Sequence, residues 1–148
     1  MKSHSSAKSN RKSNLDVIIE RSEDHFWGRI EDFGFMPTGQ GKTVSKLLQN
    51  IKDSIEDYVS HEGKKDKFWT KVDLNNVEFN IYFDVQALFE EFNELKISSI
   101  AQRAELNPSL VRQYATGNKF PSADQAKKIE VALHDLAKRL KEVAIYGK

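Results

Sequence analysis

The chain has 148 residues, 30% of them charged and 39% hydrophobic, which is enough for one domain or two small ones. It contains no cysteine, and this excludes a disulfide framework and a zinc site built on thiolates. No apolar run reaches the roughly 18 residues of a membrane span, and the N-terminus lacks the apolar centre of a signal peptide. The sequence therefore predicts a soluble, cytoplasmic protein.

The formal net charge of +1 conceals an uneven distribution along the chain. Residues 1–14 carry four basic and no acidic residues, residues 15–95 nine basic and seventeen acidic, and residues 96–148 ten basic and five acidic. A basic C-terminal segment fits a phosphate-bearing partner, and an acidic middle fits either a basic partner or simple solvation. The first 14 residues are polar and rich in serine and lysine, so we expect a disordered basic tail there.

The middle segment begins with a predicted β-hairpin. β-Branched residues dominate 15–21, a polar turn follows at 22–24, and aromatic and branched residues return at 25–31. Residues 32–38 are expected to add a short third strand before a glycine-rich turn.

A helix and a second hairpin are predicted next. Thr43 is placed to cap a helix that ends near Gly63 and carries apolar residues at helical spacing. Alternating apolar residues over 68–74 and 77–83 predict two further strands. An antiparallel sheet with one helix is therefore expected over 15–83.

After Asp84 every predicted element is a helix. Asp84 caps the first helix, and Ser98 or Ser99 is expected to cap the second. Asn107 is a suitable N-cap for the third helix, with Pro108 at its first position, and Gly117 suits its C-terminal end. We expect a separate all-helical domain over 84–148, and an α+β protein overall.

The last predicted helix runs from Ala123 to about Ala144. Ser122 and Gln125 have the spacing of a capping box. Apolar residues form a stripe longer than a three- or four-helix core requires, and the part beyond Leu136 could pair two chains or pack on the N-terminal module.

The stretch from Val111 to Ser122, VRQYATGNKFPS, resembles the end of the recognition helix in repressor-type (Xre/Cro-like) DNA-binding domains. The similarity covers roughly Val85 to Ile145 and implies a helix-turn-helix, whose second helix lies in the major groove of DNA. Glu105 departs from the family, which usually has glycine in the turn, and a positive φ at that residue would cost roughly 1 kcal/mol.

Seven polar residues are the candidates for DNA contacts, because Arg can bind guanine through two hydrogen bonds, Gln can bind adenine in the same way, and helix N-termini bind phosphate. Those expected at base edges are Ser109, Arg112 and Gln113. Those expected at phosphates are Ser99, Asn107, Asn118 and Lys119. One short helix reaches few bases, so we expect a homodimer or a higher even oligomer on operator DNA.

The first module resembles the HicB antitoxin family over roughly Leu15 to Val59. The similarity lies in a strand ending in Glu20-Arg21, an acidic turn, a strand ending in Glu-Asp-Phe, and the segment from Thr38 to Thr43. It implies a reduced ribonuclease-H-like fold without catalytic acids, which binds a small basic toxin ribonuclease of the HicA type and represses its own operon. Phe35 and Met36 depart from the family, many of whose members have Gly-Cys there.

By that resemblance the first module is the toxin-binding part. The residues expected to contact the toxin are Glu20, Asp24, Phe26, Trp27, Glu31 and Asp32. The alternative is a free-standing repressor whose N-terminal module senses a ligand or another protein.

Three enzymatic or cofactor interpretations are disfavoured, so no cofactor, metal or catalytic residue is expected. The glycines before Thr43 lack the spacing of a phosphate-binding Walker A loop, because position 36 is methionine. The acidic residues of the first hairpin do not form the converging cluster of a two-metal nuclease. The four histidines show no metal-ligand spacing. Phe68, Trp69, Tyr82 and Phe83 could stack bases, but their alternation with apolar residues favours a place in the core.

Overall fold

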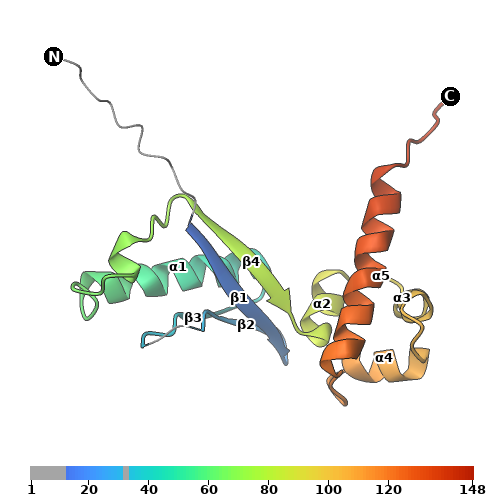
Figure 1. Ribbon diagram of the computed structural model, residues 1–148, viewed down its shortest axis with the longest axis horizontal. Coiled ribbons are helices and arrows are strands. Elements are labelled where there is room, and N and C mark those ends of the chain that lie inside the picture. Colours follow the sequence, from blue (N-terminus) through green and yellow to red (C-terminus); the bar gives the residue numbers. More distant parts are fainter. Residues whose placement is uncertain (1–12, 32–33) are drawn as a thin grey trace. The chain divides into compact units, whose positions relative to one another are not determined.

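In the computed structural model, which describes residues 13–31 and 34–148, a four-stranded sheet with one long helix precedes four further helices (Figure 1). The chain divides into two compact units between Tyr82 and Phe83. Ser13 and Asn14 already belong to the first strand, and the rest of the expected basic tail lies outside the described residues. None of the helices in the described part is long and apolar enough to cross a membrane.

The sheet has the strand order β3-β2-β1-β4. Its strands are β1 (Ser13–Ser22), β2 (His25–Arg29), β3 (Thr38–Gly41) and β4 (Val77–Phe83). β1 pairs with β2 and β2 with β3 in antiparallel fashion, which confirms the first hairpin. The sheet is mixed, however, so β4 runs parallel to β1, and the expectation of an antiparallel sheet was wrong. A parallel neighbour requires a crossover connection, and the helix between β3 and β4 provides it.

That helix, α1 (Val44–Ser60), covers one face of the sheet. The Thr43 hydroxyl accepts a hydrogen bond from the Lys46 N–H at 3.1 Å, which confirms the predicted cap. Leu47, Ile51 and Ile55 on α1 are fully buried. Val17 and Ile19 on β1 are fully buried as well. Gly41 permits the close approach, because a Cβ atom there would lie 2.7 Å from the Leu47 backbone nitrogen.

The second predicted hairpin is absent, because residues 69–71 form a short 3₁₀ helix, η1 (Trp69–Lys71), instead of a strand. The Asp66 carboxylate accepts hydrogen bonds from the backbone N–H groups of Phe68 and Trp69, at 2.9 and 3.0 Å, and so turns the chain. It also accepts one from the Tyr58 hydroxyl at 2.9 Å. Trp69 is 1% exposed, so its side chain lies in the core as expected, although it belongs to a helical turn. The same expectation was wrong for Phe68 and Tyr82, which are 53% and 57% exposed.

The predicted third strand lies later than expected, at Thr38–Gly41, because residues 34–37 form no strand; residues 32 and 33 of the expected range lie outside the described residues. The second unit contains α2 (Val85–Glu91), α3 (Ile97–Arg103), α4 (Pro108–Ala115) and α5 (Ala123–Lys141). Its core draws on all four helices and includes Phe89, Ile100, Val111 and Ile129.

The caps expected at Asp84, Asn107 and Ser122 are confirmed. The cap expected at Ser98 or Ser99 was wrong, because α3 begins earlier and Lys96 is its N-cap. The physical reason is that Ile97 already packs against the core, so the helix starts before the serines.

Candidate nucleic-acid interface

α3 and α4 are two short helices in contact, joined by a tight turn over residues 104–107. The Leu106 N–H reaches back to the Ala101 carbonyl at 2.9 Å and closes the end of α3. Glu105 has φ +57°, so the position where the repressor-type family usually has glycine is left-handed here as well. The turn therefore keeps its conformation at some cost in backbone strain.

Both ends of α4 are fixed by local hydrogen bonds. The Asn107 side chain accepts from the Ser109 N–H at 2.8 Å, and Pro108 occupies the first helical position, as expected. At the other end Gly117 has φ +79°, and the N–H groups of Asn118 and Lys119 both bond to the Gln113 carbonyl. The loop after α4 therefore folds back tightly on the helix.

The inner side of α4 is tied to α5. Val111 is fully buried and Tyr114 nearly so, while the Tyr114 hydroxyl donates to Gln125 Oε1 at 2.7 Å. The same oxygen accepts the Ser122 N–H at 3.1 Å, so the predicted capping box also anchors α4. The sequence shows the box, but it gives no sign that Tyr114 is its second partner.

Of the seven residues expected to contact DNA, five are exposed, and Gln113 and Ser99 are half-buried. Ser109, Arg112 and Gln113 lie on α4, and Asn107 caps it. Asn118 and Lys119 lie in the loop that follows, beside Phe120, whose large exposed fraction (81%) the sequence did not reveal. Ser99 lies apart from these, in the middle of α3. Within residues 13–31 and 34–148, no ion pair neutralises the Arg112 guanidinium.

A second outward surface is the sheet face opposite α1, which no helix of the N-terminal unit's described part covers. Trp27, on the central strand β2, is 46% exposed there and stands between Glu20 on β1 and Gln40 on β3. A hollow of about 430 Å³ opens over Trp27 and Arg29. We call this surface, defined by Ile18, Glu20, Trp27, Arg29 and Gln40, the open sheet face.

Arg29 on this face is held by two carboxylates. Its Nη1 lies 3.0 Å from Glu20 Oε2, and its Nε lies 3.1 Å from Glu31 Oε1. Hydrogen bonding to Glu31 raises the pKa of the Arg29 guanidinium, and Glu20 adds to this, while partial burial opposes it. The arginine is thus neutralised in place, and the face keeps an acidic surplus because Asp16 lies next to it, bonded to Asn80 at 3.0 Å.

The structure brings together only some of the six residues expected to contact a toxin. Glu20 and Trp27 lie on the open sheet face, and Glu31 reaches it through Arg29. Asp24 lies in the β1–β2 turn, paired with His25. Phe26 is 3% exposed and points to the opposite, α1-covered face. Asp32 lies outside the described residues.

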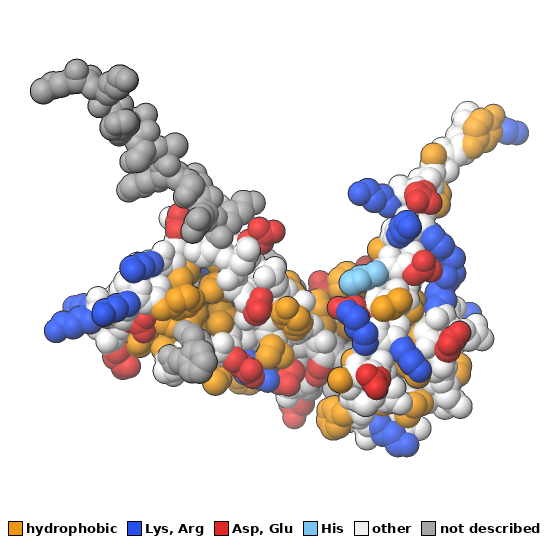
Figure 2. All heavy atoms as spheres, in the orientation of Figure 1, with side chains coloured by type: hydrophobic (Ala, Val, Ile, Leu, Met, Phe, Trp, Pro, Cys, Tyr) orange, Lys and Arg blue, Asp and Glu red, His pale blue; other side chains and the backbone are white. Residues whose placement is uncertain are grey.

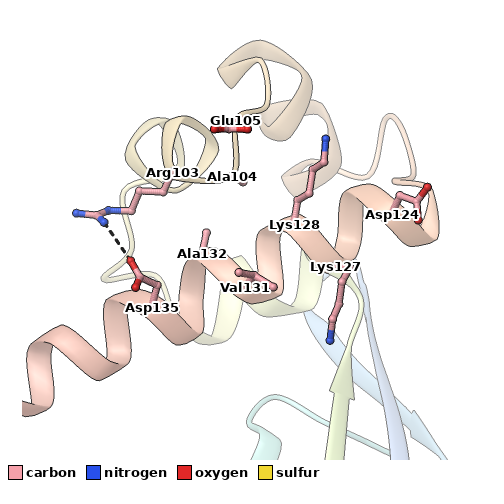
Figure 3. A pocket seen from close by; sticks show the side chains of 9 residues that line it. All are labelled: Arg103, Ala104, Glu105, Asp124, Lys127, Lys128, Val131, Ala132 and Asp135. Atoms are coloured by element: carbon pink, nitrogen blue, oxygen red, sulfur yellow. Dashed lines mark ion pairs between the residues drawn. The ribbon is translucent and has the colours of Figure 1, made fainter.

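A groove of about 780 Å³ lies between the α3–α4 turn and α5 (Figure 3). Arg103 and Asp135 pair across one end at 3.7 Å, and Lys128 extends toward the turn that carries Glu105. Three basic and three acidic side chains line the groove, so it offers no net charge to a nucleic acid. Other basic side chains are spread along α5 (Figure 2).

In the part of the chain that the structure describes, no three His, Asp or Glu side chains are grouped so that they could hold a metal ion. No family model, curated protein or solved structure matches the chain.

Proposed function

We propose that the C-terminal unit binds operator DNA through α4, as a dimer, and that the chain is a non-enzymatic antitoxin of the HicB type. The DNA-binding part of the proposal rests on how α4 is held in the fold and on which side chain it exposes. The helix is capped at both ends, fastened to α5 through Tyr114, and presents an unpaired Arg112 on its outer side. A short, firmly held helix with an exposed arginine after a tight turn suits the major groove.

The seven candidate side chains divide into two roles. Arg112 can donate two hydrogen bonds to a guanine, Gln113 can pair with an adenine, and Ser109 near the N-terminus of α4 can reach either. Asn107, Asn118, Lys119 and Ser99 would contact phosphates and fix the position of the helix. Because the Asn107 side chain already accepts the Ser109 N–H, its remaining donor group would make the phosphate contact.

A dimer follows from the size of this reading surface. One eight-residue helix covers too few base pairs for useful specificity, and a two-fold pair would place two copies of α4 about 34 Å apart on successive major grooves.

For the N-terminal unit we propose binding of a small basic toxin on the open sheet face. Trp27 provides a large, half-exposed aromatic anchor, and residues 15–95 carry the acidic surplus that attracts a basic protein. The hollow over Trp27 and Arg29 leaves room for the alternative, a repressor whose N-terminal module senses a ligand.

The test uses the full chain, the DNA upstream of its own gene, and the short basic protein encoded beside that gene. We expect specific DNA binding, and a complex with the basic protein that suppresses its ribonuclease activity. Trp27→Ala should weaken that complex by roughly 2 kcal/mol while DNA binding stays unchanged. Met36→Ala, at an equally exposed residue of the same unit, should leave both unchanged.

DNA binding without a protein partner would leave the repressor alternative, and the ligand-sensing form would then require small-molecule binding that Trp27→Ala reduces. Failure of the chain to bind any upstream DNA would overturn the proposal.

A further inference from the structure

Four of the nine basic residues of the acidic segment 15–95 lie close together between α1 and β4, at Lys64, Lys65, Lys67 and Lys71. Figure 2 shows basic side chains gathered at the end of the N-terminal unit where this stretch lies. Within the described residues, none of the four lysines takes part in an ion pair. Asp66, the acidic residue among them, accepts hydrogen bonds from two backbone N–H groups and a tyrosine hydroxyl, so its charge is compensated within the fold.

A hollow of about 470 Å³ opens on this basic surface, and its size is typical of ligand clefts. Its lining includes Lys67 and Lys71 and, among the described residues, no acidic one. Leu15 and Val72 contribute apolar surface to it, and so does Phe68. The groove beside α5 differs, because its three basic side chains are matched by three acidic ones. The hollow is therefore suited to an anion that also has an apolar part.

Phe68 is held in place at this hollow. Its N–H donates to Asp66 Oδ1 at 2.9 Å, and its carbonyl accepts the Lys71 N–H at 3.1 Å. Its ring stands at 84° to the ring of the buried Trp69, with the centroids 4.9 Å apart. Phe68 is nevertheless 53% exposed. A fixed aromatic ring with a free surface is the kind of platform on which a nucleobase stacks.

We propose that this surface binds a single-stranded nucleic acid. We call it the lysine-aromatic site and define it by Leu15, Lys67, Phe68, Lys71 and Val72. One base would stack on Phe68, and the phosphates on either side of that base would contact Lys67 and Lys71. A simple anion would use the lysines alone and an apolar ligand the ring alone, whereas a nucleotide strand uses both. A duplex offers the phosphates, but its bases stack on one another and present no free face.

The lysine-aromatic site goes beyond the proposed function and uses other parts of the chain. It lies at the first residues of β1, whereas Glu20 of the open sheet face lies near the last residues of that strand. The helix α4, which is proposed to read duplex DNA, belongs to the other unit. Substitutions can therefore separate strand binding from both proposed activities.

The test measures the fluorescence anisotropy of labelled oligomers of uridine and of thymidine, each about 12 nucleotides long, with the full chain. We expect binding, and the oligomer that binds more tightly identifies the strand as RNA or DNA. Phe68→Leu keeps an apolar side chain of similar size but has no aromatic face, so it should weaken binding about tenfold. Lys71→Ala removes one phosphate contact and should lower the slope of log affinity against log salt by about 0.7.

Two substitutions elsewhere in the N-terminal unit serve as matched controls. Tyr82→Leu makes the same kind of change at an aromatic residue that is 57% exposed and lies near the end of β4, away from the first residues of β1. Lys46→Ala removes an exposed lysine from the first turn of α1, at the opposite end of that helix from the basic stretch. Both variants should bind the oligomers like the wild type, and circular dichroism would verify that all four variants fold.

A wild-type chain that binds neither oligomer at several hundred micromolar would overturn the inference, and so would full affinity in Phe68→Leu. An oligoglutamate that competes as well as the unlabelled oligomers would also overturn it, because the site would then suit an acidic protein. Arg112→Ala should weaken binding of upstream duplex DNA but leave oligomer binding unchanged. Failure to bind the duplex alone would therefore reject the proposed function, whereas failure to bind the oligomers alone would reject this inference.

Discussion

Arg29 and Arg112 lie on outward surfaces of the two units, and their surroundings differ. Arg29 stands on a sheet with Glu20 and Glu31 at 3.0 and 3.1 Å, so its charge is satisfied within the fold. Arg112 stands on a helix whose caps and inner side chains are fixed, while its own guanidinium faces solvent. An arginine already paired organises the surface around it, and an arginine without a partner is available to an external acceptor.

The comparison predicts that each of the two units can be destabilised without loss of the other's function. Trp69→Ala should destabilise the N-terminal unit by about 3–5 kcal/mol, because it empties a fully buried site. DNA binding by the C-terminal unit should persist, since the core of that unit is its own. Denaturant unfolding combined with a DNA titration measures both effects.

Phe68→Ala is the control for that prediction, because the neighbouring Phe68 is 53% exposed and should cost far less. Equal losses in the two variants would contradict this account of the core. So would a loss of DNA binding with Trp69→Ala under conditions in which the protein remains folded.

A smaller effect is expected at the turn before α4. Glu105→Gly should stabilise the C-terminal unit by up to about 1 kcal/mol, because glycine adopts the observed φ of +57° without strain. Glu105→Ala removes the same carboxylate but keeps a Cβ atom in the left-handed region, so it should give no such gain. Thermal unfolding of the two variants distinguishes relief of backbone strain from removal of charge; an equal gain in both would indicate the charge.

Local signals predicted much of this fold. The caps at Thr43, Asp84, Asn107 and Ser122 were readable because a polar side chain precedes each helix directly. The alternation over 68–74 was misleading, because the Asp66 carboxylate bonds two backbone N–H groups there and starts a helical turn. The pattern of apolar residues does not reveal that a side chain takes up backbone N–H groups that a strand would use to pair with its neighbour.

Contacts between distant segments explain the other differences. A period of two places Phe26 and Trp27 on opposite faces of the sheet, but only the packing of α1 decides that Phe26 is covered and Trp27 is not. The parallel pairing of β4 depends on the crossover through α1, and the double role of Gln125 depends on where Tyr114 arrives. The candidate DNA residues other than Ser99 were close in sequence, and for that reason they could be grouped in advance.

The most direct test of the central claim measures the affinity of Arg112→Ala for a set of upstream DNA fragments that each carry one changed base pair. If Arg112 reads a base, the substitution costs roughly 1–3 kcal/mol on the native fragment and removes the preference at one base position of each half-site. Lys138→Ala, which removes a charge from the far end of α5, should preserve that preference. Equal weakening of Arg112→Ala on every fragment would contradict base reading and place this arginine on a phosphate.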